Sequence, residues 1–286
     1  MAIAQQLYEG IDVGNGGETG LITYMRTDST HVSEVAQKEA RSFIQAKYGE
    51  SYAPEEIPEY ETEDERAQEA HEAIRPTSVK RMPEQIKKHL TGPQFDLYQL
   101  IWQRFLGSQM APAVYDTLRV IVGADGDDHA YLLRASGSSI RFPGFLKVYD
   151  RSSGEERQAK KDLERIPKDL EAGQDQVLDK LQPEQHFTKP PARYSEASLV
   201  STLEENGIGR PSTYAPIMET LQRRGYVQKE DRRLAPTETG ITVNDLLTEF
   251  FPNIVDVNFT AEMESDLDLV ATGKQPWQEV VSDFYG

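Results

Sequence analysis

Residues 195–234 constrain the fold of this chain more than any other stretch. A helix is expected over residues 195–206, because a serine at its start is a favourable N-cap and a glycine follows it directly. A second helix is expected over residues 211–224, starting at a proline or the serine after it, again with a glycine behind it. Residues 226–234 then indicate a short hairpin. Helix, turn, helix and hairpin in this order predict a winged helix-turn-helix unit.

Apolar spacing and helix-end signals predict further helices before and after this unit in the chain. They are expected over residues 2–9, 33–48, 63–74, 83–90, 93–110, 240–251, 260–271 and 276–285. Ser29 or Ser33 can cap the second of these helices, and Gly49 can end it. The glycine-rich residues 10–20 predict a flexible connector, and residues 51–61 predict a loop.

The middle of the chain has a β-rich character. Residues 117–122 form a β-branched run, residues 125–128 have turn composition, and residues 130–135 supply a partner strand, so a hairpin is predicted. Residues 139–149 are expected to add one or two strands, interrupted by a proline–glycine pair. Residues 151–181 are charged and have little periodicity.

The predicted fold class is therefore α+β, mainly helical and multidomain. The expected domains are a helical one at residues 1–111, a β-rich one at 112–185 and a winged-helix-like helical one at 186–286. A chain of 286 residues is long enough for a separate core in each.

The net charge of −17 argues against a nucleic-acid-binding protein, which is expected to present basic surface. The acidic residues are unevenly distributed along the chain, however, and cluster in residues 50–72 and 262–268. The absence of cysteine excludes disulfides and thiolate metal sites, and it fits a cytoplasmic protein. No apolar run approaches the roughly 18 residues of a membrane span, and no secretory signal is evident at the N-terminus.

Tyr24 and Arg26 form a candidate covalent site for phosphate. If residues 21–26 form a strand, both side chains lie on one face, because side chains alternate with period two. A phenol can attack phosphorus, and a guanidinium can donate two hydrogen bonds to phosphate oxygens. The alternative is that Tyr24 packs in the core or at a sheet edge, since tyrosine is common in strands.

Three stretches resemble bacterial DNA topoisomerase I, a type IA topoisomerase, in the order found in that family. They are residues 20–30 (GLITYMRTDST), 70–77 (AHEAIRPT) and 207–215 (GIGRPSTYA). The resemblance extends from about Ala4 to the C-terminus. It implies that Tyr24 is the nucleophile, with help from Arg26, and forms a 5′-phosphotyrosine link while releasing a 3′-hydroxyl. Because the link conserves the phosphodiester energy, resealing would need no ATP.

The same resemblance implies contacts with DNA from residues in or near these stretches. They are His71, Arg75, Thr77, Arg210, Ser212, Thr213 and Arg224. Plainer roles remain open: a helical histidine is most often structural, Arg75 or Arg224 can stabilise a helix C-terminus, and Ser212 or Thr213 can cap a helix. A helix N-terminus also favours a bound anion.

Two parts of the family's pattern have no counterpart in the sequence. One is the Toprim domain, whose acidic cluster, spaced like Asp-x-Asp-x-Glu, binds Mg²⁺ in the family. The other is the C-terminal zinc-ribbon region. Residues 125–128 fit a hairpin turn better, and Asp266 and Asp268 lack a third acid. We therefore expect a central fragment without a metal or zinc site: the nucleophile-bearing domain, part of a β-rich arch and part of the DNA-gripping domain.

The resemblance implies that the full-length enzyme uses Mg²⁺ to relax negatively supercoiled DNA through single-stranded regions. It would act as a cytoplasmic, nucleoid-associated monomer without membrane attachment, with the missing metal-binding domain of the same polypeptide as partner. The fragment alone is expected to be inactive in relaxation. Two alternatives remain: a winged-helix DNA-binding protein without chemistry, and an acidic interaction scaffold that does not bind DNA.

Overall fold

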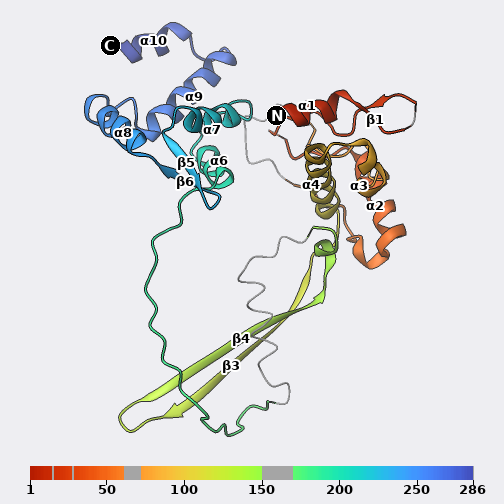
Figure 1. Cartoon of the computed structure of the whole chain (residues 1–286), viewed down its shortest axis with the longest axis vertical. Helices are drawn as coiled ribbons and strands as arrows, with labels where there is room; N and C mark the ends of the chain where they lie inside the picture. Colours follow the sequence, from red (N-terminus) through yellow and green to blue (C-terminus); the bar gives the residue numbers. More distant parts are fainter. Residues whose placement is uncertain (15, 28, 61–71, 150–169, 286) are drawn as a thin grey trace. The chain divides into compact units, whose positions relative to one another are not determined.

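The computed structural model describes residues 1–14, 16–27, 29–60, 72–149 and 170–285. The chain divides into two compact units, Met1–Glu184 and Gln185–Gly286, and each is described by itself (Figure 1). The fold is α+β and mostly helical, as expected. The further division at residues 111/112 stays a prediction. In the part of the chain described, no helix combines the length and apolar character needed to cross a bilayer.

Helices make up most of the N-terminal part of the first unit. They are α1 (Ala2–Glu9), α2 (Glu34–Tyr48), α3 (Pro83–Ile86) and α4 (Gly92–Ser108), with short 3-10 turns at Glu50–Tyr52 and Lys87–His89. Ser33 is the N-cap residue of α2, and Gly49 ends it with a φ of 104°. Thr91 and Gln94 form a capping box at the start of α4. These ends lie close to the positions predicted from local sequence signals.

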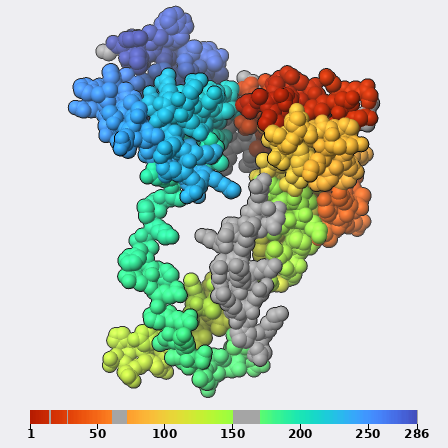
Figure 2. Space-filling model, in the orientation of Figure 1, coloured from red at the N-terminus to blue at the C-terminus, as the bar shows by residue number. Residues whose placement is uncertain are grey.

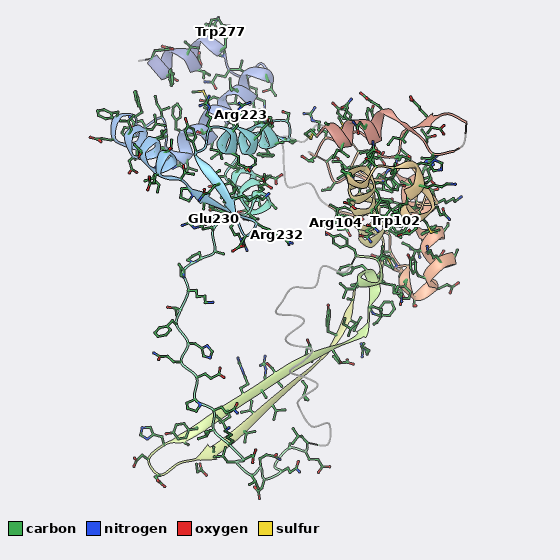
Figure 3. All side chains as sticks on the ribbon, in the orientation of Figure 1. Trp102, Arg104, Arg223, Glu230, Arg232 and Trp277 are labelled. Atoms are coloured by element: carbon green, nitrogen blue, oxygen red, sulfur yellow. The ribbon has the colours of Figure 1, made fainter. Side chains whose placement is uncertain are left out.

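The core of this unit forms around α4. Its Tyr98 and Leu106 are fully buried together with Leu7 of α1 and Ile44 of α2, and the space-filling view shows α1 in red directly against the gold residues of α4 (Figure 2). Trp102 on α4 (Figure 3) donates its Nε1–H to the Val79 carbonyl at 3.0 Å. Burying side chains of this size contributes roughly 1.5–3 kcal/mol each, so α4 organises the unit.

The connector predicted at residues 10–20 contains regular structure. Strands β1 (Ile11–Asp12) and β2 (Glu18–Thr19) pair antiparallel. Between them the Gly14 N–H donates to the Asp12 carboxylate at 2.8 Å. The connector predicted to be flexible therefore contains a small hairpin with glycines between its two strands.

The strand predicted at residues 21–26 does not form. Only one antiparallel bridge is present, between Ile22 and Pro76. It is flanked by the Thr23 N–H donating to the Arg75 carbonyl and the Thr77 N–H donating to the Leu21 carbonyl. Pro76 has no N–H to extend the ladder, so pairing stops at a single residue.

The helix predicted at residues 63–74 falls largely on residues 61–71, which lie outside the described residues. Residues 72–74 are described and are not helical. The Ala73 N–H donates instead to the His31 carbonyl at 2.7 Å. A proline at position 76 also disfavours helical conformation in the residue before it. The C-terminal end of that predicted helix was therefore wrong.

A long β-hairpin follows α4. Strand β3 (Val114–Asp125) pairs antiparallel with β4 (Ala130–Phe142), as the sequence predicts, although both strands are longer than expected. No further strand follows β4 in the described part of residues 139–149. Pro143 precedes a short 3-10 turn at Gly144–Lys147, where Gly144 has a φ of 48°. A side chain at Gly144 would meet the Pro112 carbonyl, so this glycine permits the turn against the end of α4.

The second unit has the predicted helix, turn, helix and hairpin. Its elements are α6 (Glu196–Glu205), α7 (Tyr214–Arg223), β5 (Val227–Glu230), β6 (Arg233–Pro236), α8 (Glu238–Phe250), α9 (Val257–Ala271) and α10 (Trp277–Tyr285). Ser195 caps α6 by accepting a hydrogen bond from the Ser198 N–H, and the two form a capping box. The strands of the hairpin pair antiparallel from Val227 to Glu230.

Helix α7 begins later than predicted. It starts at Tyr214 and not at residue 211 or 212, because the preceding residues form a turn. In this turn the Thr213 N–H donates to the Arg210 carbonyl at 2.8 Å. Thr213 also uses its hydroxyl within the turn, so it does not cap the helix.

Candidate nucleophile site and nucleic-acid contacts

The segment that carries Tyr24 is anchored on both sides just before this residue. The Leu21 N–H donates to the Leu7 carbonyl at the end of α1 at 2.7 Å. The Thr23 hydroxyl donates to the Ala73 carbonyl at 2.7 Å and accepts from the Arg75 N–H at 2.9 Å. Leu21 and Ile22 are almost completely buried. The backbone therefore leaves the core at a fixed point, one residue before Tyr24.

The phenol ring of Tyr24 lies at the surface of the first unit. Its side chain is 48% exposed, so core packing, the plainer alternative, does not apply. The ring makes an edge-to-face contact with Tyr8 of α1, with ring centroids 5.3 Å apart and an interplanar angle of 68°. An exposed phenol on a firmly anchored backbone is accessible to a large substrate such as a polynucleotide.

Arg26 is half-buried and follows Tyr24 in a stretch without regular secondary structure. The period-two argument that placed the two side chains on one face required a strand, and residues 24–27 do not form one. The pairing of Tyr24 with Arg26 therefore stays a prediction, which now depends on the family resemblance alone.

Arg75 is held by an ion pair within the chain. Its Nε and Nη2 donate to the two carboxylate oxygens of Glu72 at 2.8 and 2.9 Å, and its Nη1 donates to the Pro76 carbonyl at 2.9 Å. The two side chains are only 13% and 27% exposed. Arg75 thus stabilises the loop that anchors Thr23, and it does not end a helix. Its predicted contact with DNA is untested.

Glu72 also connects this loop to the start of α2, because its carboxylate accepts a hydrogen bond from the Ser33 N–H at 2.8 Å. Partial burial by itself would raise the pKa of Glu72. The hydrogen bonds from Arg75 and Ser33 outweigh that effect and hold its pKa below the ordinary value. The carboxylate is therefore charged at neutral pH and links two segments that are distant in sequence.

The other residues predicted in this region have different positions. The Thr77 hydroxyl donates to the Gly20 carbonyl at 2.7 Å and accepts from Arg81 Nη1 at 2.9 Å. It therefore ties the residue before Leu21 to a cationic side chain. His71 lies outside the described residues, and its contact with DNA stays a prediction.

In the second unit, Arg210 is engaged by two acidic residues of α9. Its guanidinium forms an ion pair with Glu264 at 2.9 Å and donates from Nη2 to both carboxylate oxygens of Asp268 at 2.9 and 3.0 Å. These contacts join the turn before α7 to α9. A DNA phosphate would have to compete with two carboxylates for this side chain.

Ser212 and Thr213 are exposed in the same turn. The Thr213 hydroxyl accepts from the Arg210 N–H at 2.8 Å and donates to the Arg210 carbonyl at 3.0 Å. Gly209 precedes them with a φ of 81°, and a side chain there would crowd the Tyr214 ring. Thr213 thus closes the turn, and the predicted role of both hydroxyls in phosphate binding is untested.

Arg224 follows α7 and is exposed, as is Arg223 on the last turn of that helix (Figure 3). The nearby hairpin turn carries Arg232, with a φ of 65° (Figure 3). These cations lie at the end of α7 and on the hairpin that follows it. Of the residues predicted to contact DNA in this unit, Arg224 is therefore better exposed than Arg210.

Sequence reasoning missed several partners at these sites. Tyr8, Glu72, Glu264 and Asp268 contact the predicted residues, but none was predicted. Glu72 lies only three residues from Arg75, so the sequence itself offered this opposite-charge pair. The other partners are more distant in sequence, up to 58 residues for Arg210 and Asp268, and no local signal could have identified them.

The described residues contain no group of three or more His, Cys, Asp or Glu side chains that could hold a metal ion. The acidic pair Asp266 and Asp268 lies on α9, and Asp268 is used by Arg210. The residues described here therefore do not fit a Mg²⁺ site.

Comparison with known proteins identifies the family. A family model described as DNA topoisomerase matches residues 1–282, nearly the whole chain. This chain belongs to the type IA DNA topoisomerase family. Its structure is also similar to that of full-length topoisomerase I from Thermotoga maritima, with a TM-score of 0.78 and 39% sequence identity. The match covers 100% of this chain but only 44% of that protein. The topoisomerase chain described here thus spans less than half the length of this relative.

The Glu72–Arg75 pair generates a prediction about stability. Glu72→Gln should lower the free energy of unfolding by about 1–3 kcal/mol at pH 7, because it removes the charge from a partly buried, hydrogen-bonded pair. The folded-state pKa of Glu72 is lowered, so the stabilisation is present above the ordinary value of 4.5 and is lost as the pH falls through the lowered pKa. Urea unfolding from pH 7 to pH 3.5 measures this difference.

Glu34→Gln is the matched control, because Glu34 pairs with Lys38 on the exposed surface of α2. It should leave the unfolding free energy nearly unchanged, since exposed pairs contribute little. Equal effects of the two substitutions, or an effect of Glu72→Gln that does not shrink at low pH, would contradict the role given to Glu72.

Proposed function

We propose that this chain contains the nucleophile-bearing domain and part of the DNA-gripping region of a type IA topoisomerase. The complete enzyme cleaves one DNA strand through Tyr24, passes a strand through the gap and reseals it, which relaxes negative supercoils. The observation that carries this proposal is the family match over residues 1–282 together with an exposed phenol at Tyr24.

In the proposed cleavage step, the Tyr24 Oη attacks the phosphorus of a DNA phosphodiester. A bond forms between phosphorus and the phenol oxygen while the bond to the 3′-oxygen breaks. The phenol loses its proton, and the 3′-oxygen gains one and leaves as a hydroxyl. One phosphodiester replaces another, so the reverse attack by the 3′-hydroxyl restores the strand without ATP.

The phenol of a free tyrosine has a pKa of about 10, so attack at neutral pH needs nearby positive charge or a base. Arg26 is the residue proposed to stabilise the charge that develops on the phenol and the phosphate. Mg²⁺ belongs to the proposal for the complete enzyme, and its ligands are placed outside this chain. The anchoring of Thr23 by Ala73 and Arg75 supports this account, because a nucleophile needs a fixed backbone.

Single-stranded DNA is the proposed partner. The exposed Arg223 and Arg224 and the turn at Ser212 and Thr213 support contacts with phosphates in the second unit. The net charge of −17 counts against DNA binding, but Glu264 uses part of this negative charge to bind Arg210, and Arg223 and Arg224 remain exposed. We further propose that the complete enzyme is a cytoplasmic monomer.

A second candidate is a winged-helix DNA-binding protein without chemistry. The order of α6, α7, β5 and β6 favours it, since this is the plan of a winged helix-turn-helix unit. It gives no role to the exposed phenol of Tyr24. An acidic scaffold that never binds DNA is the third candidate, and oligonucleotide binding would exclude it.

Tyr24→Phe tests the chemistry. In the full-length enzyme this change should abolish both the covalent protein–DNA complex and relaxation, because phenylalanine has no nucleophilic oxygen, while DNA binding should remain. Denaturing gel electrophoresis of a labelled oligonucleotide detects the covalent complex. Tyr115→Phe, on the exposed face of β3, is the control and should leave it intact. A covalent complex that survives in Tyr24→Phe would exclude Tyr24 as nucleophile.

The isolated 286-residue chain should not relax plasmid DNA in the presence of Mg²⁺. The physical reason is that its described residues offer no metal site. A plasmid relaxation assay followed on an agarose gel measures this, with the full-length enzyme as positive control. Multiple-turnover relaxation by the chain alone would show that the chemistry does not require the rest of the polypeptide.

Arg224→Ala should weaken binding of a single-stranded oligonucleotide to this chain and reduce the salt slope by about 0.7, the value for one lost phosphate contact on a single strand. Fluorescence anisotropy over a salt series measures both quantities. Arg119→Ala on β3 is the matched control, since Arg119 is also exposed. Identical salt slopes for the two variants would argue against a specific contact from Arg224.

A further inference from the structure

Tyr8 is the aromatic neighbour of the proposed nucleophile. It lies on the last turn of α1, and its ring meets the ring of Tyr24 edge to face, at a centroid distance of 5.3 Å. Tyr8 is 40% exposed and Tyr24 is 48% exposed, so the pair lies at the surface of the first unit. Edge-to-face packing at this distance is one of the favourable geometries for two aromatic rings.

The backbone around Tyr8 is fixed to the backbone of the nucleophile segment. Its neighbour Leu7 is fully buried and accepts a hydrogen bond from the Leu21 N–H at 2.7 Å. Gly20 allows the two segments to approach, because a Cβ at this position would lie 2.7 Å from the Tyr8 carbonyl oxygen. The last turn of α1 and the Tyr24 segment are therefore held in one arrangement by groups other than the two rings.

The segment after Thr23 has no regular secondary structure, so strand pairing does not hold the backbone that carries the Tyr24 side chain. Tyr24 is also 48% exposed. Reaction at phosphorus requires the phenol oxygen to approach along one direction, and a misplacement of about 1 Å can reduce a rate by about a hundredfold.

We propose that Tyr8 is a positioning residue for Tyr24. Its ring holds the phenol of Tyr24 in the edge-to-face orientation and so limits the directions in which the hydroxyl can approach bound DNA. The inference rests on the proposed role of Tyr24 as nucleophile and extends it to a residue on a different helix. This positioning depends on the aromatic ring of Tyr8 and does not require its hydroxyl.

The first experiment tests the positioning in the 286-residue chain and needs no activity. Ring protons of Tyr24 are shifted by the ring current of Tyr8, and selective tyrosine labelling makes them visible by NMR, with Tyr24→Phe giving the assignment. Tyr8→Leu should move these resonances toward the values of unstructured tyrosine, whereas Tyr8→Phe should leave them in place. Unchanged resonances in Tyr8→Leu would overturn the proposal.

The second experiment measures single-turnover cleavage of a labelled single-stranded oligonucleotide by the full-length enzyme. Tyr8→Leu should lower the cleavage rate about tenfold with an unchanged dissociation constant for the oligonucleotide, and Tyr8→Phe should cleave at the wild-type rate. Tyr115→Leu is the matched control, because Tyr115 is 39% exposed on β3, and it should have no effect. Thermal unfolding of each variant separates a loss of positioning from a loss of folding.

The outcomes separate the proposals. A wild-type cleavage rate in Tyr8→Leu, or an equal loss in Tyr8→Phe and Tyr8→Leu, would overturn positioning by the ring. If Tyr24→Phe still forms a covalent complex, the proposed function fails, and the NMR experiment still decides whether Tyr8 orients Tyr24. Gly20→Ala provides a further check, since it separates α1 from the segment without changing either ring, and it should slow cleavage in the same direction.

Discussion

The structure of the first unit depends on how the backbone of Leu21 to Thr23 is held between two partners. The Leu21 N–H bonds to the end of α1, whereas the Leu21 carbonyl and the Thr23 N–H bond to residues on either side of Pro76. Buried backbone groups must find partners, and these bonds satisfy them without forming a sheet. The exposed phenol of Tyr24 therefore lies two residues after the buried pair Leu21 and Ile22, and the core fixes the backbone from which it projects.

Acidic side chains hold two of the arginines in the family's motifs, Arg75 and Arg210. Glu72 binds Arg75, and Glu264 and Asp268 bind Arg210. Part of the excess of negative charge thus has a structural use. It also means that a positively charged residue in a motif is not automatically available to DNA. The availability of Arg210 depends on whether a phosphate can displace two carboxylates, whereas Arg224 is already exposed.

Local signals predicted most helix ends and the main hairpin. Gly49 and Ser195 act as expected because caps depend on neighbours within a few residues, whereas Ser33 lies at the start of α2 without accepting a capping hydrogen bond through its side chain. The errors have other causes. The strand at residues 21–26 is reduced to a single bridge because its partner is Pro76, which lacks an N–H. The helix end at residue 74 is replaced by the hydrogen bond from the Ala73 N–H to the carbonyl of the distant His31. The start of α7 was misjudged because Thr213 closes a turn where a cap was expected.

The sequence by itself determined the family, the order of most elements and the candidate nucleophile. Motifs and helix signals are local, so each can be read from a short stretch of the chain. It did not determine which residues support that nucleophile. Only the tertiary structure brings Tyr8 against Tyr24 and Asp268 against Arg210. These contacts arise when separate elements pack on a shared core, and packing between distant segments leaves no periodic or compositional trace in the chain.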